Sequence, residues 1–389
     1  MNGLPSLLKS LLASEDSTAG PSRAAAIRLD RGCTELRRGR PVALRTAAGW
    51  LLAAPVETLS EALLQRLTPS GLPLRLLLTA ERLRALQAGG DSGLPVPGVP
   101  LALNLPSDIG LARLQQLAAV TAGPADLTGL EASSAPTEEA PAWSAGIAMC
   151  KRARLIPALL LVNLAADAGE TLEASDVMAF DPADASLALP VQAAAVRRVS
   201  DARVPLAAEE NCTLVLFREL DGDAEHVAII VGQPPADAPV PVRLHSACLT
   251  GDLLGSLRCD CGPQLQQAVA RLAETGGVLL YLSQEGRATG LANKLRAYRL
   301  QDAGLDTLQA DRYLGFREDE RDFAAAGAML KALGHTCIQL LTNNPQKIEA
   351  LRRAGIEVVD RLPLPGGVNS HNERYIRTKQ QAGHLASDV

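Results

Sequence analysis

Three of the seven cysteines of this chain lie within fourteen residues of one another, as Cys248, Cys259 and Cys261. In an extended segment, side chains two positions apart point to the same side of the chain, so Cys259 and Cys261 can act together. A turn at 251–255 can return Cys248 to this pair. A compact thiolate set favours Zn²⁺, and three protein ligands leave the fourth position open, as catalytic zinc sites do.

The alternative interpretation is that these are three buried, small, apolar thiols. The neighbouring residues argue against it, because polar side chains crowd the same segment to a degree that a plain core strand would not tolerate. They are Arg243, His245, Ser246, Thr250, Asp252 and Arg258. The segment therefore indicates a metal site.

Length and composition describe the rest of the chain broadly. A chain of 389 residues suggests two domains, or three. The net charge of −5 argues against a general nucleic-acid binder, which normally carries a basic patch. An odd number of cysteines, three of them clustered, is typical of a reducing compartment. The start of the chain lacks a signal-peptide pattern and no apolar run is long enough to span a bilayer, so we expect a cytoplasmic protein.

The first half of the chain alternates helical and strand-like patterns. We expect 1–22 to be a flexible tail and 23–197 to form one folded domain, with a buried strand at 74–78. Residues 90–107 are rich in Gly and Pro, which predicts a loop. The composition of 129–144 predicts a flexible linker or a long surface loop.

In the second half, the residues that follow the cysteines alternate helix and strand. Pro263 suits the first turn of a helix. The apolar run 278–282 predicts a buried strand that delivers Glu285 and Arg287 at its C-terminal end, where α/β units bind ligands. Glu285 could accept from N–H groups of a ligand or order a water, and Arg287 could clamp a phosphate. On the next helix we expect charged residues to face solvent, namely Lys294, Arg296 and Arg299.

A second candidate ligand corner follows the strand that ends near residue 341. Thr342, Asn343 and Asn344 precede Pro345, which marks the entry to a helix. Backbone N–H groups at a helix N-terminus favour anions. Together with the Thr342 hydroxyl and Lys347, they predict a phosphate-binding corner.

Four motifs, taken in order, resemble GTP cyclohydrolase II. They are LHSACLTGDLLGSLRCDCGPQL, YLSQEGRATGLANKLRAYRLQDAGLDT, LGFREDERDF and LLTNNPQKIEAL. The resemblance covers about 199–389, roughly half of the chain, and implies an α+β fold with two domains. The second, 198–389, would be a mixed α/β domain with a catalytic zinc site.

The resemblance implies a zinc-dependent hydrolase of riboflavin biosynthesis that acts on GTP. A water activated by the zinc opens the imidazole ring with loss of formate, and the triphosphate, bound with Mg²⁺, loses pyrophosphate. The metal ligands would be Cys248, Cys259 and Cys261. The catalytic residues would be Tyr298, Asp319 as proton acceptor and Arg321, which attacks or holds the α-phosphate. The GTP contacts would be Arg243, Leu244, His245, Ser246, Ala247, Gln264, Glu285, Gly286, Arg287, Thr307, Thr342 and Lys347. The resemblance also suggests a homodimer.

Residues 23–197 are faintly similar to a 3,4-dihydroxybutanone-4-phosphate synthase domain. That family needs an acidic Mg²⁺-binding run after its first strand and a histidine further on. Here 41–56 contains no acidic residue, and all five histidines lie at position 226 or later. We therefore interpret this half as a degenerate domain that keeps the shape without the catalysis.

Two positions depart from the cyclohydrolase pattern. Ala247 stands where the family usually has Glu, and Ala288 stands where it often has Gly. An alanine at 288 is unfavourable if the backbone there needs a positive φ. Three hypotheses follow: a working cyclohydrolase, a divergent enzyme that releases only pyrophosphate, and a non-catalytic nucleotide-binding protein. Retention of all three cysteines argues against the last.

Overall fold

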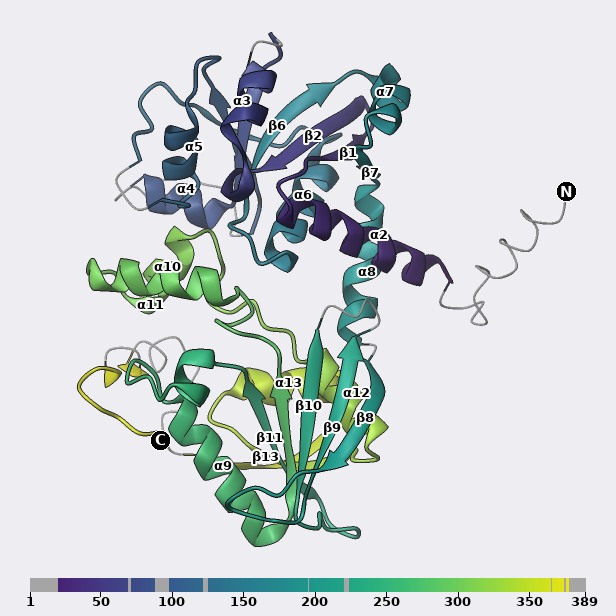
Figure 1. The fold of residues 1–389 in the computed structure, drawn as a ribbon, viewed down its shortest axis with the longest axis vertical. Coiled ribbons are helices and arrows are strands. Elements are labelled where there is room, and N and C mark those ends of the chain that lie inside the picture. Colours follow the sequence, from purple (N-terminus) through teal and green to yellow (C-terminus); the bar gives the residue numbers. More distant parts are fainter. Residues whose placement is uncertain are drawn as a thin grey trace, which may run out of the picture. The chain divides into compact units, whose positions relative to one another are not determined.

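The chain forms two compact units, each built on its own sheet (Figure 1). The computed structural model describes residues 20–68, 71–87, 98–121, 125–194, 196–219, 224–364, 366–373 and 376–377. One unit comprises 1–80 and 99–192, and the other comprises 81–98 and 193–389. Most of the expected tail, 1–22, lies outside the described residues. No helix in the described ranges combines the length and apolar character that crossing a membrane requires.

The first unit contains a seven-stranded sheet of order β5-β4-β3-β6-β2-β1-β7. All neighbours pair antiparallel except β1 and β7, which are parallel. Its strands are β1 (Val42–Thr46), β2 (Gly49–Pro55), β3 (Leu74–Leu78), β4 (Leu101–Leu105), β5 (Ala132–Ser134), β6 (Ala158–Leu164) and β7 (Met178–Phe180). Its helices are α2 (Gly20–Arg37), α3 (Glu61–Leu67), α5 (Leu111–Leu117), α6 (Ala140–Arg152), α7 (Gly169–Ala174) and α8 (Pro182–Ala194), with short 3₁₀ turns at Val56–Thr58 and Ala166–Ala168. Helix α4 (Ala80–Leu86) follows β3 in the chain, but all of it except Ala80 belongs to the second unit.

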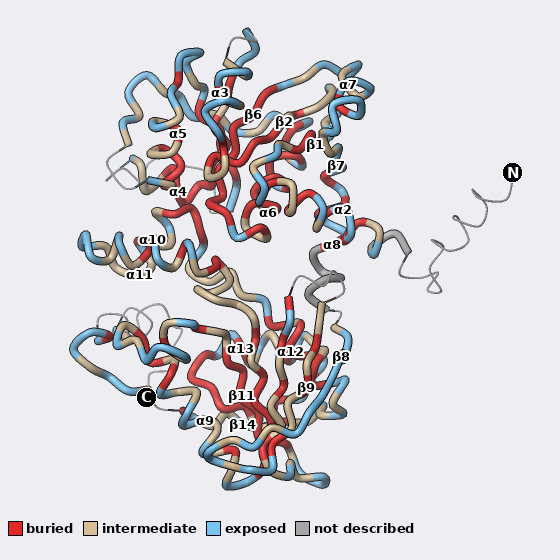
Figure 2. Tube along the Cα trace, in the orientation of Figure 1, coloured by how far each residue is buried: buried red, intermediate tan, exposed pale blue. Residues whose placement is uncertain are grey.

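Helices α2 and α6 cover this sheet with apolar faces. Leu29 and Leu36 of α2 and Trp143 of α6 are fully buried, in one cluster with Leu44 and Leu51 from the strands. Figure 2 shows the central strands of this unit as mostly buried, whereas α2 and α6 alternate between buried and exposed residues, as helices with one apolar face do. The spacing of Leu29 and Leu36, two turns apart, places both on the side of α2 that meets the sheet.

Two expectations for the first unit are wrong. Residues 90–107 were expected as a loop; 90–97 lie outside the described residues, but β4 occupies 101–105 and pairs with both β3 and β5. Residues 129–144 were expected as a linker, but they contain β5 and the first residues of α6. In both segments the composition favours a loop. Pairing with distant strands overrides this preference at β4 and β5, and burial of Trp143 overrides it at the start of α6.

The second unit also contains a seven-stranded sheet, of order β14-β13-β11-β12-β10-β9-β8. Strands β14, β13, β11 and β12 are mutually parallel, and β12, β10, β9 and β8 pair antiparallel. The strands are β8 (Val196–Arg203), β9 (Cys212–Glu219), β10 (Glu225–Val231), β11 (Val240–Ser246), β12 (Gly277–Leu282), β13 (Cys337–Leu341) and β14 (Glu357–Leu362). The helices are a π-helical turn η4 (Leu249–Leu253), α9 (Cys261–Thr275), α10 (Leu291–Asp302), α11 (Thr307–Tyr313), α12 (Ala324–Ala332) and α13 (Pro345–Arg353).

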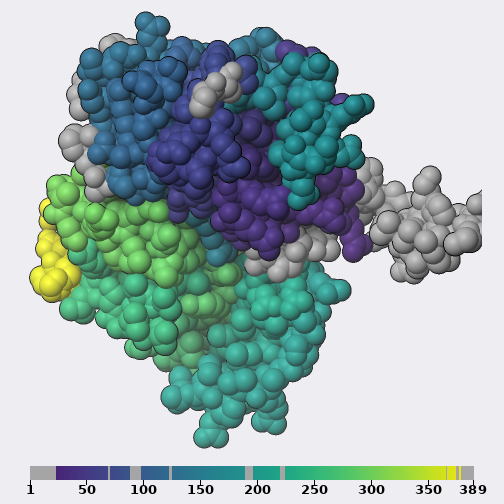
Figure 3. All heavy atoms as spheres, turned by 45° about the horizontal axis from the view of Figure 1, so that its top comes forward, coloured from purple at the N-terminus to yellow at the C-terminus, as the bar shows by residue number. Residues whose placement is uncertain are grey.

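Successive side chains along a strand point to opposite faces of the sheet, so the core of this unit consists of clusters on both faces. Val278 and Leu280 of β12 belong to a cluster that includes Leu330 of α12. Leu279, between them, belongs to a second cluster that includes Leu272 of α9. A mixed sheet with helices on both faces therefore confirms the expected fold class. Helix α10 packs against α11, and this pair forms part of the bright green surface in Figure 3.

The loop between β12 and α10 has an unusual backbone. Gly286, Arg287 and Ala288 have φ values of 62°, 58° and 72°, in the left-handed region that costs an L-residue about 1–2 kcal/mol. Backbone hydrogen bonds hold this conformation: the amide of Ala288 donates to the Gln284 carbonyl at 3.2 Å, and that of Gly290 donates to the Glu285 carbonyl at 3.0 Å. The backbone of Ala288 is therefore strained. This strain was expected from the sequence for the case that position 288 has a positive φ.

We expect Ala288→Gly to stabilise the second unit by about 0.5–1 kcal/mol. The relief of left-handed strain exceeds the ~0.4–1 kcal/mol lost because glycine is freer in the unfolded chain. Scanning calorimetry would show this as a Tm rise of roughly 1–3 °C. The control is Ala292→Gly at an exposed position of α10, which should lower the Tm; an unchanged or lower Tm for Ala288→Gly would contradict the prediction.

Candidate active site

The carboxyl ends of three adjacent parallel strands, β13, β11 and β12, open onto one cavity of about 170 Å³. Open α/β sheets commonly bind ligands at this edge. The lining residues are Arg243, His245, Ser246, Ala247, Cys248, Arg258, Cys259, Cys261, Gln264, Gln284, Glu285, Gly286, Arg287, Thr289, Lys294, Ala297, Tyr298, Gln301, Thr307, Asp311, Arg321, Thr342, Asn343, Asn344 and Lys347. Of the site residues expected from the sequence, all but Leu244 and Asp319 line it.

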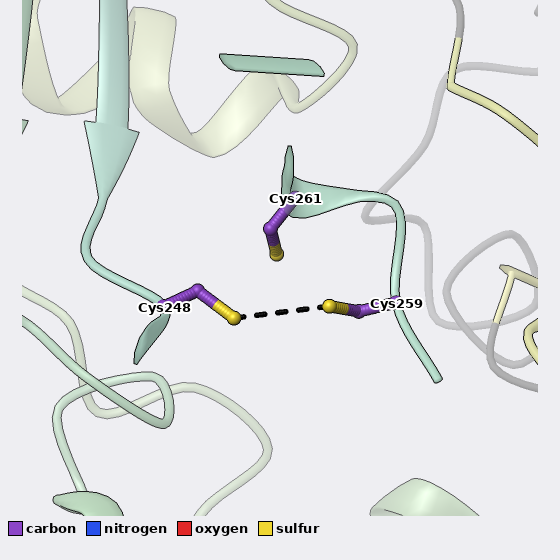
Figure 4. A group of neighbouring side chains, drawn as sticks. All are labelled: Cys248, Cys259 and Cys261. Atoms are coloured by element: carbon purple, nitrogen blue, oxygen red, sulfur yellow. Dashed lines mark hydrogen bonds between the residues drawn. The ribbon is translucent and has the colours of Figure 1, made fainter. Parts of the chain in front are cut away.

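The three cysteines point toward one another (Figure 4). The Cys248 and Cys259 sulfurs are 3.7 Å apart, and all three sulfurs lie within 4.8 Å of one another. Tetrahedral Zn²⁺ with Zn–S bonds of ~2.3 Å needs sulfurs ~3.8 Å apart. The donor set and its spacing therefore fit a zinc ion with three protein ligands.

Glycine at 251 makes this approach of the sulfurs possible. Cys248 is the N-cap residue of η4, two residues beyond the end of β11, whereas Cys261 is the first residue of α9. A Cβ at 251 would lie 2.8 Å from the Cys259 sulfur and 3.0 Å from the Cys248 sulfur. A Cβ at Gly262 would lie 2.3 Å from the Gly251 carbonyl oxygen. The two glycines let η4 pack against α9, which brings the thiols together.

Hydrogen bonds favour a thiolate at Cys248. Contacts with the Cys259 and Cys261 thiols, followed by the Lys294 ammonium, hold the pKa of Cys248 far below its usual range despite burial. The Gly251 amide also donates to the Cys248 sulfur at 3.3 Å. The first ligand is thus prepared to be anionic, as metal binding requires.

Asp252 connects the cysteine segment to the sheet. Its carboxylate accepts from the Cys248 amide at 2.9 Å, the Tyr281 hydroxyl at 2.9 Å and the His245 Nε2 at 3.0 Å. Burial lowers the pKa of His245, so the ring is neutral and donates through Nε2–H. The His245 Nδ1 is then a buried acceptor without a protein partner.

Among the described residues, six cationic side chains line the same cavity: Arg243, Arg258, Arg287, Lys294, Arg321 and Lys347. Arg243 is 5% exposed, and burial lowers its pKa to about 10. It donates to the Leu341 carbonyl at 2.9 Å and to Gln264 at 2.7 Å. The Lys347 ammonium donates to the Leu244 carbonyl at 2.8 Å, which places Leu244 at the site through its backbone while its side chain lies in the core.

Arg321, another of these cations, forms a forked ion pair with Asp319. The Arg321 Nε donates to one carboxylate oxygen at 2.9 Å and the Nη2 to the other at 2.5 Å. Burial would raise the pKa of Asp319, but the Arg321 hydrogen bonds outweigh it and lower that pKa. Asp319, which does not line the cavity itself, therefore contacts it only through Arg321.

The loop after β12 supplies a second pair of linked charges. Glu285 accepts from the Leu249 amide at 2.6 Å and from the Lys294 ammonium at 2.8 Å. Arg287 donates to Asp311 at 2.7 Å and to the Glu318 carbonyl at 3.1 Å. The expectation that Lys294 faces solvent is wrong, because its side chain is 11% exposed and contacts Cys248 and Glu285.

The remaining expected residues occupy the walls of the cavity. The Tyr298 ring is covered by the Arg258 guanidinium, 4.9 Å from its centre, and burial raises the pKa of its hydroxyl. Thr307 is the first residue of α11, and Thr342 accepts from the Asn344 amide at 3.0 Å before α13 begins. Ala247 contributes only a methyl group, and its amide donates to the Leu282 carbonyl.

Sequence reasoning missed several lining residues, above all Lys294 and Asp311. Asp311 lies on α11 and Lys294 on α10, outside the loops that carry recognisable ligand patterns. A charged residue on a helix is normally solvated, so only the fold shows that these two face the cavity. Arg258, Gln284 and Asn343 stand in or next to segments already singled out, and that proximity was an available signal.

We expect Gly251→Ala to remove most of the bound zinc. The added methyl would lie within 3.0 Å of two of the three sulfurs and force them apart. Metal analysis after dialysis against a weak chelator measures the effect. The matched control is Gly110→Ala, where the added methyl meets no atom within 4 Å, and zinc should be retained. Full zinc in Gly251→Ala would contradict the prediction.

The buried carboxyl of Asp311 predicts a pH dependence of stability. Burial raises the pKa of Asp311 to about 7, above an unfolded-state value of ~3.9. The folded state therefore binds the proton more tightly, so this group's stabilising contribution is complete below about pH 4 and is lost as the pH rises through 7. The Tm of the unmutated protein should fall relative to that of Asp311→Asn between about pH 5 and 8. Asp237→Asn, at an exposed position, is the control; parallel curves for Asp311→Asn would contradict this.

Comparison with known proteins places the site in a family. The family model described as GTP cyclohydrolase II matches residues 197–363. A GTP cyclohydrolase-2 from Azospirillum brasilense is 43% identical over 378 residues, which cover 94% of this chain and 96% of that protein. One from Xylella fastidiosa (strain 9a5c) is 40% identical over 367 residues, 92% of this chain and 87% of that protein.

Other relatives match only half of the chain. A GTP cyclohydrolase-2 from Escherichia coli O9:H4 is 50% identical over 192 residues, 49% of this chain and 97% of that protein. A solved structure of a two-domain 3,4-dihydroxy-2-butanone 4-phosphate synthase from A. baumannii aligns over 87% of this chain and 100% of its own, at 17% identity and a TM-score of 0.30. That likeness is too low to support an argument, whereas the sequence matches show that the chain belongs to the GTP cyclohydrolase II family.

Proposed function

We propose that the second unit is a zinc-dependent GTP cyclohydrolase II. It would hydrolyse GTP to 2,5-diamino-6-(5-phosphoribosylamino)pyrimidin-4(3H)-one, formate and pyrophosphate, the first step of riboflavin biosynthesis. Family membership supports the activity. The observation that carries it in the structure is one cavity lined by both the thiol triad and buried cations.

The cations favour a polyanionic ligand. Arg243 and Arg321 are close enough for each charge to oppose the other, and Arg243 and Lys347 both disfavour a charge on His245. Confining such like charges is costly unless an anion joins them. A triphosphate is the anion that the family's substrate supplies, and we assign Arg243, Arg321, Lys347 and the Thr342 corner to it.

Unsatisfied polar atoms in the cavity wall favour a ligand that both donates and accepts hydrogen bonds. Within the described part of the chain, four buried atoms of lining residues have no protein partner: Arg243 Nε, His245 Nδ1, Ser246 Oγ and Gln284 Oε1. Buried polar groups are normally paired, so these are candidates for ligand contacts. A purine nucleotide offers the matching donors and acceptors, and we include Gln264, Glu285 to Arg287 and Thr307 in its site.

Cys248, Cys259 and Cys261 would hold the zinc ion, which supplies a Lewis acid with one open position. The two lining carboxylates, Glu285 and Asp311, are each paired with a cation. We therefore expect Mg²⁺ to bind through the triphosphate oxygens and water rather than through these carboxylates.

The Asp319–Arg321 pair would act on the phosphate groups of the bound nucleotide. A guanidinium held by a carboxylate stays protonated and presents fixed donors to charge that develops on a phosphoryl group. We propose that Arg321 stabilises the α-phosphate during pyrophosphate release and that Asp319 positions it. Tyr298, with its raised pKa, remains a neutral hydroxyl donor near the thiols.

The decisive experiment incubates zinc-loaded protein with GTP and Mg²⁺ and follows formate and pyrophosphate together. We expect both products in equal amounts, with both lost in Cys259→Ser. Equal release would also show that Ala247 is a tolerated replacement. The matched control is Cys337→Ser, which removes a thiol outside the triad and should keep the activity.

Two other outcomes are informative. Pyrophosphate without formate would contradict the full reaction and locate the defect at ring opening, near Ala247 and the metal ligands. The absence of both products would overturn the enzymatic proposal and leave a nucleotide-binding protein.

We also propose, on the resemblance alone, that the protein is a homodimer and that 23–197 is a degenerate synthase-like domain without catalysis. The lack of acidic residues in 41–56 supports the second proposal. The half-length relatives named GTP cyclohydrolase-2 are consistent with activity in the second half alone.

A further inference from the structure

The Lys294 side chain lies against a zinc ligand. Its ammonium donates to the Cys248 sulfur at 3.0 Å and to the Glu285 carboxylate at 2.8 Å. It also lies 5.9 Å from the centre of the Tyr298 ring. The side chain is 11% exposed, so its ammonium group is largely shielded from water and contacts these partners instead. A surface lysine of α10 would make none of these contacts.

Glu285 fixes the direction of this ammonium. One carboxylate oxygen accepts from Lys294, and the other accepts from the Leu249 amide, directly after Cys248. Glu285, Lys294 and the Cys248–Leu249 backbone therefore form a closed ring of contacts around one metal ligand. The ring joins three separate elements: the loop after β12, helix α10 and the start of η4.

We propose that Lys294 is a positioning residue of the metal centre, whose N–H···S hydrogen bond fixes the Cys248 thiolate and limits the charge that it donates to the metal. This inference rests on the proposed zinc site but assigns a role to a residue outside the ligand set. Groups that hydrogen-bond metal ligands orient them and tune the metal, and their loss typically costs about 10–100-fold in affinity or activity.

The charge balance gives the physical reason. Three thiolates on a divalent ion leave a net negative charge in a buried site, which weakens the metal as a Lewis acid. An ammonium at 3.0 Å from one sulfur draws electron density away from the metal. Hydrogen bonds to ligand sulfurs shift the properties of metal–thiolate centres in this direction. Lys294 would thus keep a thiolate-rich centre electrophilic.

The test uses the full-length protein loaded with Co²⁺, without nucleotide. Thiolate-to-cobalt charge-transfer absorption reports directly on electron donation by the sulfurs. We expect this band to move to lower energy in Lys294→Met, because the freed thiolate becomes a better donor. Lys294→Gln, a second neutral variant, should shift it in the same direction, and Lys294→Arg should stay close to the unmutated protein.

Arg299→Met is the matched control, since Arg299 lies on the same helix but is exposed and does not line the cavity; its band should not move. With zinc, kcat should fall about 10–100-fold in Lys294→Met, with KM for GTP little changed. An unmoved band in both neutral variants would overturn the role of Lys294, and a large rise in KM alone would assign it to the nucleotide instead. Failure of the unmutated protein to bind Co²⁺ would overturn the metal site itself.

Discussion

The backbone contact between Gly251 and Gly262 holds the site together. It lets the π-helical turn after β11 lie directly against the first turn of α9, with no side chain between them. Cys248 lies at one side of this contact, and Cys259 and Cys261 lie at the other. Any larger residue at either glycine would separate the two segments, so the geometry of the thiol triad depends on a contact that contains no cysteine.

The chemistry around that contact is a balance of opposite charges. Cys261, which lines the cavity, and Asp260, which does not, favour the positive charge of Arg243, and Lys347 and Arg321 bring further positive charge to the same cavity. Each cation is held by a specific partner, such as Asp319 for Arg321 and the Leu244 carbonyl for Lys347. Fixed charges of this kind need no reorganisation when a ligand arrives, which is how electrostatic preorganisation assists catalysis.

The site belongs entirely to the second unit, and the three strands that deliver it are neighbours in one sheet. Each parallel strand ends in a short polar segment: Ser246 to Cys248 after β11, Gln284 to Arg287 after β12, and Thr342 to Asn344 after β13. The pairing of β11 with both β12 and β13 brings segments about a hundred residues apart into one cavity. The first unit has its own core, and the long relatives match most of the chain across both halves.

The sequence alone determined the thiol triad, the strand-end segments and the family, because each of these can be recognised from residues of specific chemistry that lie close together in the chain. It could not determine that Lys294 and Asp311 face inward, since a charge on a helix shows its direction only when the packing of that helix is known. Nor could it determine β4 and β5, whose hydrogen-bonding partners lie far away in the chain. The tertiary structure decided these points because burial and strand pairing depend on what a segment meets, which local composition does not record.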